Sequence, residues 1–166
     1  MIIVIFGYPG TGKTYVGKIF EKYFSFYLYE GDVDMPKSMK IKVTKNYHIS
    51  DRDRDKLFDN IERKIKVLRN IYKKLVITQT FIKEKYREQI LKANPDARFI
   101  YIKTDDEIRQ KRLAKRETVP LSRNYADQMI KNFDKPKIDH LIIYNNKDGE
   151  NEIKKQIYQC NVTLVS

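Results

Sequence analysis

The sequence has few of the features that mark secreted, membrane-spanning or repetitive proteins. Its single cysteine, Cys160, cannot form a disulfide within the chain, which is typical of a reducing cytosol and favours a cytoplasmic location. No apolar run approaches the roughly 18 residues of a spanning helix, so we expect no contact with a membrane. No repeat or low-complexity linker is present. The length suits one compact domain, and we therefore expect a single domain over residues 1–166.

The charge balance is strongly basic. The chain has 34 Lys and Arg against 22 Asp and Glu, a formal net charge of +12. Such a field favours anionic partners, whether a nucleotide, a sugar acid or a nucleic-acid backbone. The lysines, however, are spread among acidic neighbours, as on solvated helix faces. No nucleic-acid-binding module is recognisable, so nucleic acid stays open as a partner without being favoured.

Short apolar runs alternate with amphipathic stretches along the chain. Strand-like runs lie at residues 2–6, 26–29, 75–78, 99–102 and 141–144. A helix is predicted from a cap at Ser50, with Asp53 three residues on, to about residue 73, because Leu57, Ile61 and Ile65 repeat on one face. This alternation predicts an α/β fold with a parallel sheet covered on both faces. Ligands of such sheets bind beyond the carboxyl ends of the strands.

Residues 7–14 read GYPGTGKT and match the GxxxxGK(S/T) pattern of a phosphate-binding P-loop. The pattern needs glycines because backbone N–H groups point inward around the phosphates, where a Cβ would obstruct them. Residues 1–6 predict a strand rather than a signal peptide, and residues 15–24 have the apolar spacing of a helix. We expect the nucleotide to be bound by Gly7, Tyr8, Pro9, Gly10, Thr11, Gly12, Lys13, Thr14 and Tyr15.

Lys13 and Thr14 are expected to carry the chemistry of this loop. The Lys13 ammonium reaches the β and γ phosphates in such loops, and the Thr14 hydroxyl is offered to Mg²⁺. The start of the following helix adds its positive dipole end. ATP and Mg²⁺ are therefore the expected cosubstrates. A single small domain leaves little room for the machinery of a motor or a switch, which favours a kinase.

An acidic cluster, YEGDVD, follows the second predicted strand. Asp32 is the predicted catalytic carboxylate, which accepts a hydrogen bond from an acceptor hydroxyl and orients it for in-line attack. Glu30 and Asp34 share its face if the segment stays extended, and Glu30 is expected to support the metal through water. The alternative is a surface turn with incidental acids.

A basic segment, IRQKRLAKRETVP, follows the fourth predicted strand. Arg109, Arg112 and Arg116 lie in helical register, and arginines on a mobile segment stabilise the charge of a transferring phosphoryl group. We interpret residues 109–125 as a lid, with Arg112 and Arg116 as catalytic residues, and residues 32–58 as the acceptor-binding region. The alternative is a solvated basic helix.

These residues resemble the small P-loop carbohydrate kinases of the gluconokinase type, relatives of shikimate and adenylate kinases. The family has a (D/E)GD motif followed by Pro, a D-x-D-R element that opens a long helix, a small hydroxyl residue followed by Lys and Tyr-Arg, and an R-L-x-x-R lid. The matching residues are Glu30 to Asp32 with Pro36, Asp51, Asp53 and Arg54, Thr80, Lys83, Tyr86 and Arg87, Asn94 and Pro95, and Arg112, Leu113 and Arg116.

The resemblance implies a five-stranded parallel sheet of order 2-3-1-4-5. It also implies transfer of the γ-phosphate of ATP, with Mg²⁺, to a primary hydroxyl of a small polyol acid. We expect a monomer or a homodimer. Arg54, Lys83 and Arg87 would then bind this acceptor, and Arg116 would belong to the lid. A guanidinium fork suits a carboxylate or phosphate on the acceptor, which agrees with the assignment of Arg54 and Arg87.

The sequence departs from this family where the acceptor is expected to lie. Met35 replaces a histidine before the Pro, and NYHI, with His48, replaces a G-x-P-L turn. The lid resembles that of P-loop polynucleotide kinases, through Val119, Pro120, Met129, Phe133 and Pro136. The acceptor can therefore differ from gluconate. One alternative is a nucleotide or polynucleotide 5′-hydroxyl kinase, and another is an NTP-binding regulatory module without an acceptor.

Overall fold

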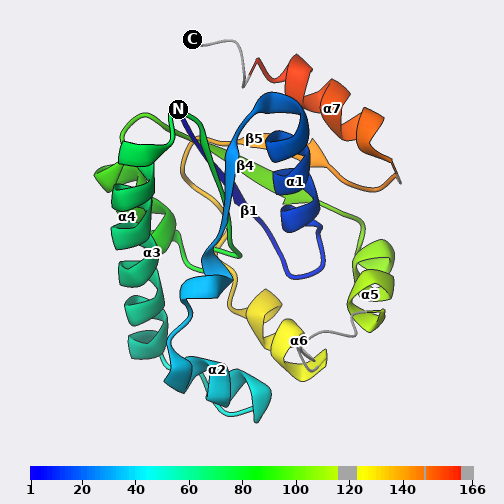
Figure 1. The fold of residues 1–166 in the computed structure, drawn as a ribbon. Coiled ribbons are helices and arrows are strands. Elements are labelled where there is room, and N and C mark those ends of the chain that lie inside the picture. Colours follow the sequence, from blue (N-terminus) through cyan, green and yellow to red (C-terminus); the bar gives the residue numbers. More distant parts are fainter. Residues whose placement is uncertain (116–122, 148, 162–166) are drawn as a thin grey trace.

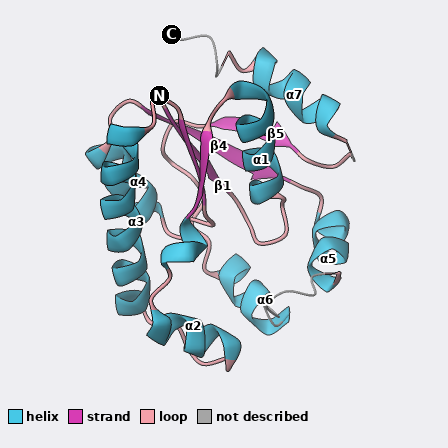
Figure 2. Ribbon diagram, in the orientation of Figure 1, coloured by secondary structure: helices cyan, strands magenta, loops and turns pink. Residues whose placement is uncertain are grey.

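The computed structural model describes residues 1–115, 123–147 and 149–161 and shows one five-stranded parallel sheet (Figures 1 and 2). The strands are β1 (Ile2–Phe6), β2 (Tyr27–Glu30), β3 (Leu75–Thr78), β4 (Ala97–Lys103) and β5 (Leu141–Tyr144). They lie in the order β2-β3-β1-β4-β5, and every pair is parallel. The predicted α/β fold and strand order are confirmed.

Helices cover both faces of the sheet. On one face, Ile3 and Ile5 of β1 pack with α1 (Lys13–Phe24) and α7 (Glu150–Gln159). On the other face, Val4 and Phe6 pack with α3 (Asp51–Ile71) and α4 (Glu84–Ala93). Because successive β1 side chains alternate between the two layers, the fully apolar run IIVIF is explained by burial on both faces. Neither layer could lose its helices without exposing this strand.

Shorter elements gather beyond the carboxyl ends of the strands, the edge at which the sequence motifs end. They are a 3₁₀ helix (Gly31–Asp34), α2 (Lys37–Thr44), α5 (Asp106–Ala114) and α6 (Arg123–Lys131). Figure 1 shows α2, α5 and α6 arranged around this edge. In the part of the chain that the structure describes, no helix is both long and apolar enough to cross a membrane.

The long helix α3 begins at the predicted cap and ends at Ile71, close to the predicted end. Ser50 accepts a hydrogen bond from the backbone N–H of Asp53, and the Asp53 carboxylate accepts one from the backbone N–H of Ser50. Lys42 of α2 lies 2.7 Å from the same carboxylate. The Lys42 ammonium and the Ser50 hydroxyl hold the pKa of Asp53 well below its ordinary value. This carboxylate therefore fastens α2 to the start of α3.

Candidate active site

The P-loop connects the end of β1 to the start of α1 and has the strained turns that its glycines permit. Gly10 and Gly12 have φ values of 84° and 85°, in the left-handed region. A Cβ on Gly12 would lie 2.3 Å from the Nδ2 atom of Asn145, so the loop also packs tightly against the end of β5. Lys13 donates hydrogen bonds to the carbonyl oxygens of Gly7, at 3.1 Å, and Tyr8, at 2.9 Å. The ammonium therefore lies over the loop, as a phosphate-binding lysine requires.

Thr14 and Glu30 lie together beside this loop. The Thr14 hydroxyl donates a hydrogen bond of 2.9 Å to the Glu30 carboxylate, the last residue of β2. Both are oxygen ligands of the kind that Mg²⁺ prefers, and Mg²⁺ in such sites keeps several waters. Within the described ranges, no group of three or more His, Cys, Asp or Glu side chains could hold a metal ion. The pair therefore suits a hydrated cation held partly by the nucleotide.

Asp32 is held in place by a residue that the sequence analysis did not identify. The amide nitrogen of Gln79, one residue after β3, donates a hydrogen bond of 2.9 Å to Asp32. The amide oxygen of Gln79 accepts one of 2.6 Å from the backbone N–H of Thr80. Both ends of the Gln79 amide are thus used, which fixes the Asp32 carboxylate at the carboxyl edge of the sheet.

The three acids of YEGDVD do not share one face. The extended segment considered in the sequence analysis is not formed, because the chain turns into the 3₁₀ helix at Gly31. The Asp34 carboxylate accepts a hydrogen bond of 2.7 Å from the Tyr29 hydroxyl. Burial, reinforced by this bond, raises the pKa of Tyr29. Asp34 is therefore a structural partner of β2, while Glu30 and Asp32 remain at the site.

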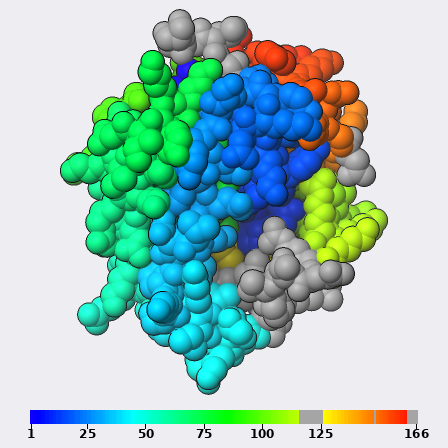
Figure 3. Space-filling view, in the orientation of Figure 1, coloured from blue at the N-terminus to red at the C-terminus, as the bar shows by residue number. Residues whose placement is uncertain are grey.

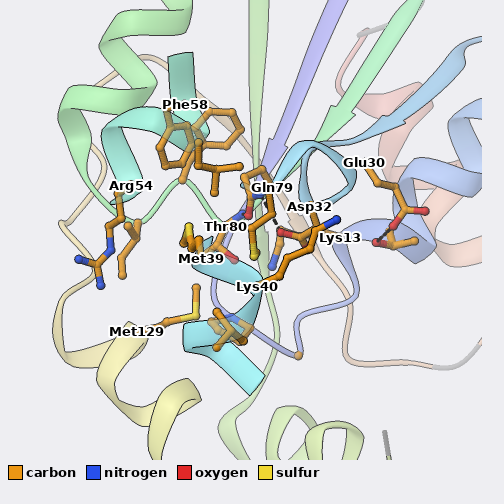
Figure 4. Close-up of a pocket in the computed structure, with 18 of the residues that line it drawn as sticks. Lys13, Glu30, Asp32, Met39, Lys40, Arg54, Phe58, Gln79, Thr80 and Met129 are labelled. Carbon is orange, nitrogen blue, oxygen red and sulfur yellow. Dashed lines mark hydrogen bonds between the residues drawn. The ribbon is translucent and has the colours of Figure 1, made fainter. Parts of the chain in front are cut away.

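One cavity of about 640 Å³ joins the P-loop to the acidic residues. Its lining includes Lys13, Thr14, Glu30 and Asp32 at one end and Arg54 at the other, and its volume is in the range of small-molecule sites. Figure 4 shows Lys13 and Arg54 on opposite sides, with Met39 and Met129 between them. In Figure 3 the segment 31–44, light blue to cyan, lies beside a recess in which part of α6, yellow, is visible.

Between these two ends the cavity is lined by apolar side chains, and we call this part of the cavity the apolar chamber. Its side chains come from the segments around α2, α3, β3 and α6 and are Met35, Met39, Val43, Leu57, Phe58, Phe81, Ile82 and Met129. This wall was not predicted from the sequence. A signal was present, since three of the four methionines of the chain line it, but they are 94 residues apart from first to last and only folding brings them together.

Of the three basic residues expected to bind the acceptor, only Arg54 lines the cavity. Its guanidinium donates a hydrogen bond of 2.8 Å to the Ile49 carbonyl and lies 3.4 Å from Asp51. Lys83 instead forms an ion pair of 3.2 Å with Asp134. The structure therefore places one of these cations at the cavity and not the predicted group of three.

Arg87 corrects the sequence prediction most clearly, because its side chain is fully buried. The guanidinium donates hydrogen bonds to Glu84, at 2.6 Å, and to the carbonyl oxygens of Phe81, at 2.6 Å, and Asp134, at 2.8 Å. The guanidinium carbon lies 5.3 Å from the centre of the Phe6 ring and 5.2 Å from the centre of the Phe133 ring. Arg87 is thus a structural cation of the core and is not available to an acceptor.

Arg87 and its partner Glu84 also support the wall of the apolar chamber. Phe81, a wall residue, has a φ of 47°, which is uncommon for a residue with a side chain. Its carbonyl is fixed by Arg87, and Glu84 accepts further bonds from the backbone N–H groups of Lys137 and Ile138. The turn after β3 and the segment after α6 are therefore tied to α4 through two buried side chains.

The basic helix α5 packs against the P-loop. Arg112 donates a hydrogen bond of 2.9 Å to the carbonyl of Asn145, whose side chain donates one of 2.8 Å to the carbonyl of Thr11. The guanidinium of Arg109 lies 5.9 Å from the centre of the Tyr8 ring. Arg116 and the rest of the predicted lid up to residue 122 lie outside the described residues. The described part of the segment thus brings two arginines to the nucleotide side.

The two histidines do not join the site. His48 is exposed before the Ser50 cap, and His140 packs against Phe6 and Tyr101 with ring centroids 5.8 and 5.9 Å apart. No metal or catalytic role was predicted for His140, and its contacts account for its position as a packing residue.

Comparisons with known proteins identify a matching family and several solved structures of similar fold. The sequence profile of a family described as an AAA domain matches residues 3–131 of the 166. No curated protein sequence matches the chain. A sugar kinase from Janibacter sp. HTCC2649, in its unliganded structure, has a similar fold, with a TM-score of 0.79 and 16% identity. The alignment covers 98% of this chain and 93% of that one.

Two further solved structures have the same fold. A gluconokinase from Sinorhizobium meliloti 1021 has a TM-score of 0.77 and 17% identity, with 98% of this chain and 93% of that chain covered. A shikimate kinase from Acinetobacter baumannii, in complex with shikimate, has a TM-score of 0.67 and 16% identity, with the same coverage. The predicted resemblance to small P-loop kinases of the gluconokinase type is confirmed at the level of the fold.

Proposed function

This chain belongs to the AAA domain family, and on that premise we propose that it is an ATP-dependent kinase that transfers the γ-phosphate to a hydroxyl group of a small molecule. One observation carries the proposal: the P-loop and Asp32 line one cavity of about 640 Å³, a volume typical of small-molecule sites, which extends past Asp32 to Arg54. A nucleotide switch or motor has no need of such space for an acceptor beyond its phosphates.

In the proposed mechanism the chain binds ATP, orients the acceptor hydroxyl and neutralises the charge of the transferring phosphoryl group. The loop amides and Lys13 hold the ATP phosphates, and Arg112, after leaving Asn145, stabilises the charge that spreads over the transferring group. Thr14 and, through water, Glu30 would hold Mg²⁺, which supplies charge neutralisation between the β and γ phosphates when bound. Asp32, fixed by Gln79, accepts a hydrogen bond from the acceptor hydroxyl and directs its oxygen toward the γ-phosphorus.

The proposed acceptor is a small hydroxy compound with at most one anionic group. The names of the gluconokinase and the shikimate kinase say that they act on gluconate and shikimate, which supports a sugar acid or a similar acid. Arg54 supports one anion at the far end of the cavity. We propose the chain as one kinase domain, with the acceptor region at 32–58 and the lid at 109–125.

A nucleotide or a polynucleotide 5′-hydroxyl is the second candidate acceptor, and the net charge of +12 favours it. Salt separates the two candidates. Binding of a nucleic acid weakens steeply as salt rises, whereas KM for a small acid shows only modest screening.

The test is transfer of labelled phosphate from ATP to a panel of sugar acids, shikimate, nucleosides, nucleoside monophosphates and 5′-hydroxyl oligonucleotides. We expect a labelled product with at least one panel member and none with the Lys13→Ala variant. ATP hydrolysis that no panel member accelerates would instead identify an NTP-binding regulatory module and overturn the kinase proposal.

A further inference from the structure

The wall of the apolar chamber restricts what the proposed kinase can hold beyond the phosphates. Eight apolar side chains line the chamber, and Met39, Leu57, Phe58, Phe81 and Ile82 among them are buried. They line the same cavity as Asp32 and Arg54, and Figure 4 shows Met39 between these two residues, where we expect the body of the acceptor to lie. The chamber is therefore a site for an apolar body with one reactive hydroxyl at its edge.

Several polar groups of the same lining are bonded to the protein itself, among them the Lys40 ammonium, which donates to the Val33 carbonyl at 3.4 Å. Both ends of the Gln79 amide are used by Asp32 and Thr80, and the Thr44 hydroxyl donates to the carbonyl of Lys40. Arg54 is already bonded to the Ile49 carbonyl. A polyol acid with several hydroxyl groups would place most of them against methionine and phenylalanine, without partners. The chamber thus disfavours the polyol that the family resemblance implies.

The side chains of the wall suit a ring. Methionine sulfur makes favourable contacts with the edges of aromatic rings, and three methionines face this one space. Phe58 and Phe81, with ring centroids 5.2 Å apart and an interplanar angle of 39°, form an aromatic corner beside them. An aliphatic body could fill the volume, but only a flat ring uses both the thioethers and the aromatic corner.

Resting on the proposed phosphoryl transfer, and in place of the sugar acid as its acceptor, we infer that the acceptor is an alcohol whose body is an aromatic or heteroaromatic ring. The hydroxyl oxygen of the acceptor forms the new bond to the γ-phosphorus, and the bond from that phosphorus to the bridging oxygen of ATP breaks. ADP leaves with the electron pair of that bond. The hydroxyl proton passes through Asp32 to water. The products are ADP and the phosphate ester of the ring-bearing alcohol.

Binding of candidate acceptors can be measured without phosphoryl transfer, so it tests this inference separately from catalysis. Protein labelled with ¹³C at the methionine methyl groups gives four signals, of which three lie in the chamber and Met1 does not. With ADP and Mg²⁺ present, we add adenosine, thymidine, pyridoxine, gluconate or shikimate in turn. We expect ring-current shifts of Met35, Met39 and Met129 with the ring-bearing compounds, an unshifted Met1, and little change with gluconate or shikimate.

The inference is overturned if no ring compound shifts the methionine signals, or if gluconate shifts them as much as the ring compounds do. Both outcomes hold whether or not the protein is active. Ring-current shifts without phosphorylation would support a ring-binding chamber but would overturn the kinase proposal, and with it the role of the ring compound as acceptor. The nucleosides and pyridoxine separate two sources of the same ring chemistry.

A matched pair of variants locates the binding site. Met35→Gln introduces a polar group at a half-buried wall position, and Ile71→Gln makes a similar change at an exposed position of α3 far from the lining. We expect Met35→Gln to weaken binding of the ring compound that shifts the signals most by about tenfold. Ile71→Gln is expected to leave it unchanged. Equal binding by both variants would place the ring elsewhere and overturn the inference.

Discussion

The two halves of the cavity are built in opposite ways. On the phosphate side, the P-loop is one contiguous segment, residues 7–14, and we expect it to bind phosphate largely through backbone groups and one lysine. The apolar chamber comes from side chains that start at Met35 and end at Met129, carried by separate elements. The first is therefore determined by local spacing and the second by packing. Substitutions on the phosphate side should change the chemistry, and those around the chamber should change stability or selectivity.

The largest effect is expected at the phosphate side. Lys13→Ala removes the ammonium that lies over the loop, and we expect kcat to fall by about 10³-fold because this cation is expected to neutralise the phosphates. The initial rate of phosphoryl transfer measures the loss. Urea unfolding should be nearly unchanged, since Lys13 is not part of the core. An active Lys13→Ala protein would remove the functional contrast between the two halves.

Behind the chamber, Arg87→Leu is expected to destabilise the fold by about 3 kcal/mol or more. The reason is that Glu84 would keep a buried charge without its partner, and the carbonyl oxygens of Phe81 and Asp134 would lose their donor. Urea unfolding measures this change. Lys83→Met is the control, because its ion pair is partly exposed and should contribute less than about 1 kcal/mol. Similar losses in both variants would contradict the structural role of Arg87.

At the junction of the two halves, Asp32→Asn should lower kcat by about 10²-fold. An asparagine oxygen can still accept the bond from Gln79, so the side chain stays in place while its charge is lost. Calorimetric titration with a non-hydrolysable ATP analogue should give an affinity close to that of the unmodified protein. Full activity would exclude Asp32 from the mechanism, and a large loss of nucleotide affinity would assign it to the phosphate side.

The smallest effect is expected at the capping box of α3. Asp53→Asn should cost about 1 kcal/mol at pH 7, since it loses the Lys42 ion pair and weakens the cap. Asp51→Asn, a more exposed change in the same turn, should cost less.

The same carboxylate predicts a pH dependence. The pKa of Asp53 is lowered in the folded protein, so its stabilisation is complete above the unfolded pKa of about 3.9 and is lost as pH falls below it. Urea unfolding from pH 7 to pH 2.5 should therefore show the difference between Asp53→Asn and the unmodified protein shrinking in acid. A difference that stays constant would contradict the assigned pKa shift.

The sequence predicted the parallel sheet and the P-loop because these depend on signals a few residues long. Five apolar runs and one glycine-rich loop at fixed spacing leave little choice of fold. The Ser50 cap was equally local, and its bonds are formed as predicted. Resemblance to a family added the strand order, which spacing alone does not give.

The chamber side could not be predicted in the same way. A motif gives the residue type but not the direction of its side chain. Arg87 points into the core because Glu84 and the carbonyl oxygens of Phe81 and Asp134 accept its hydrogen bonds there. Asp34 differs from Asp32 only through a 3₁₀ turn that decides which acid meets Tyr29. Gln79 carries no motif, and its role follows from the pairing of β2 with β3.

The Lys13 ammonium, bonded to two carbonyl oxygens of its own loop, has one further consequence. These bonds hold the curvature of the loop around an internal cation, so we expect little chain entropy to be lost when phosphate binds. An entering phosphate exchanges places with those carbonyl oxygens instead of folding the segment around itself. Association with ATP should then be rapid and limited by encounter, with a small heat of reorganisation.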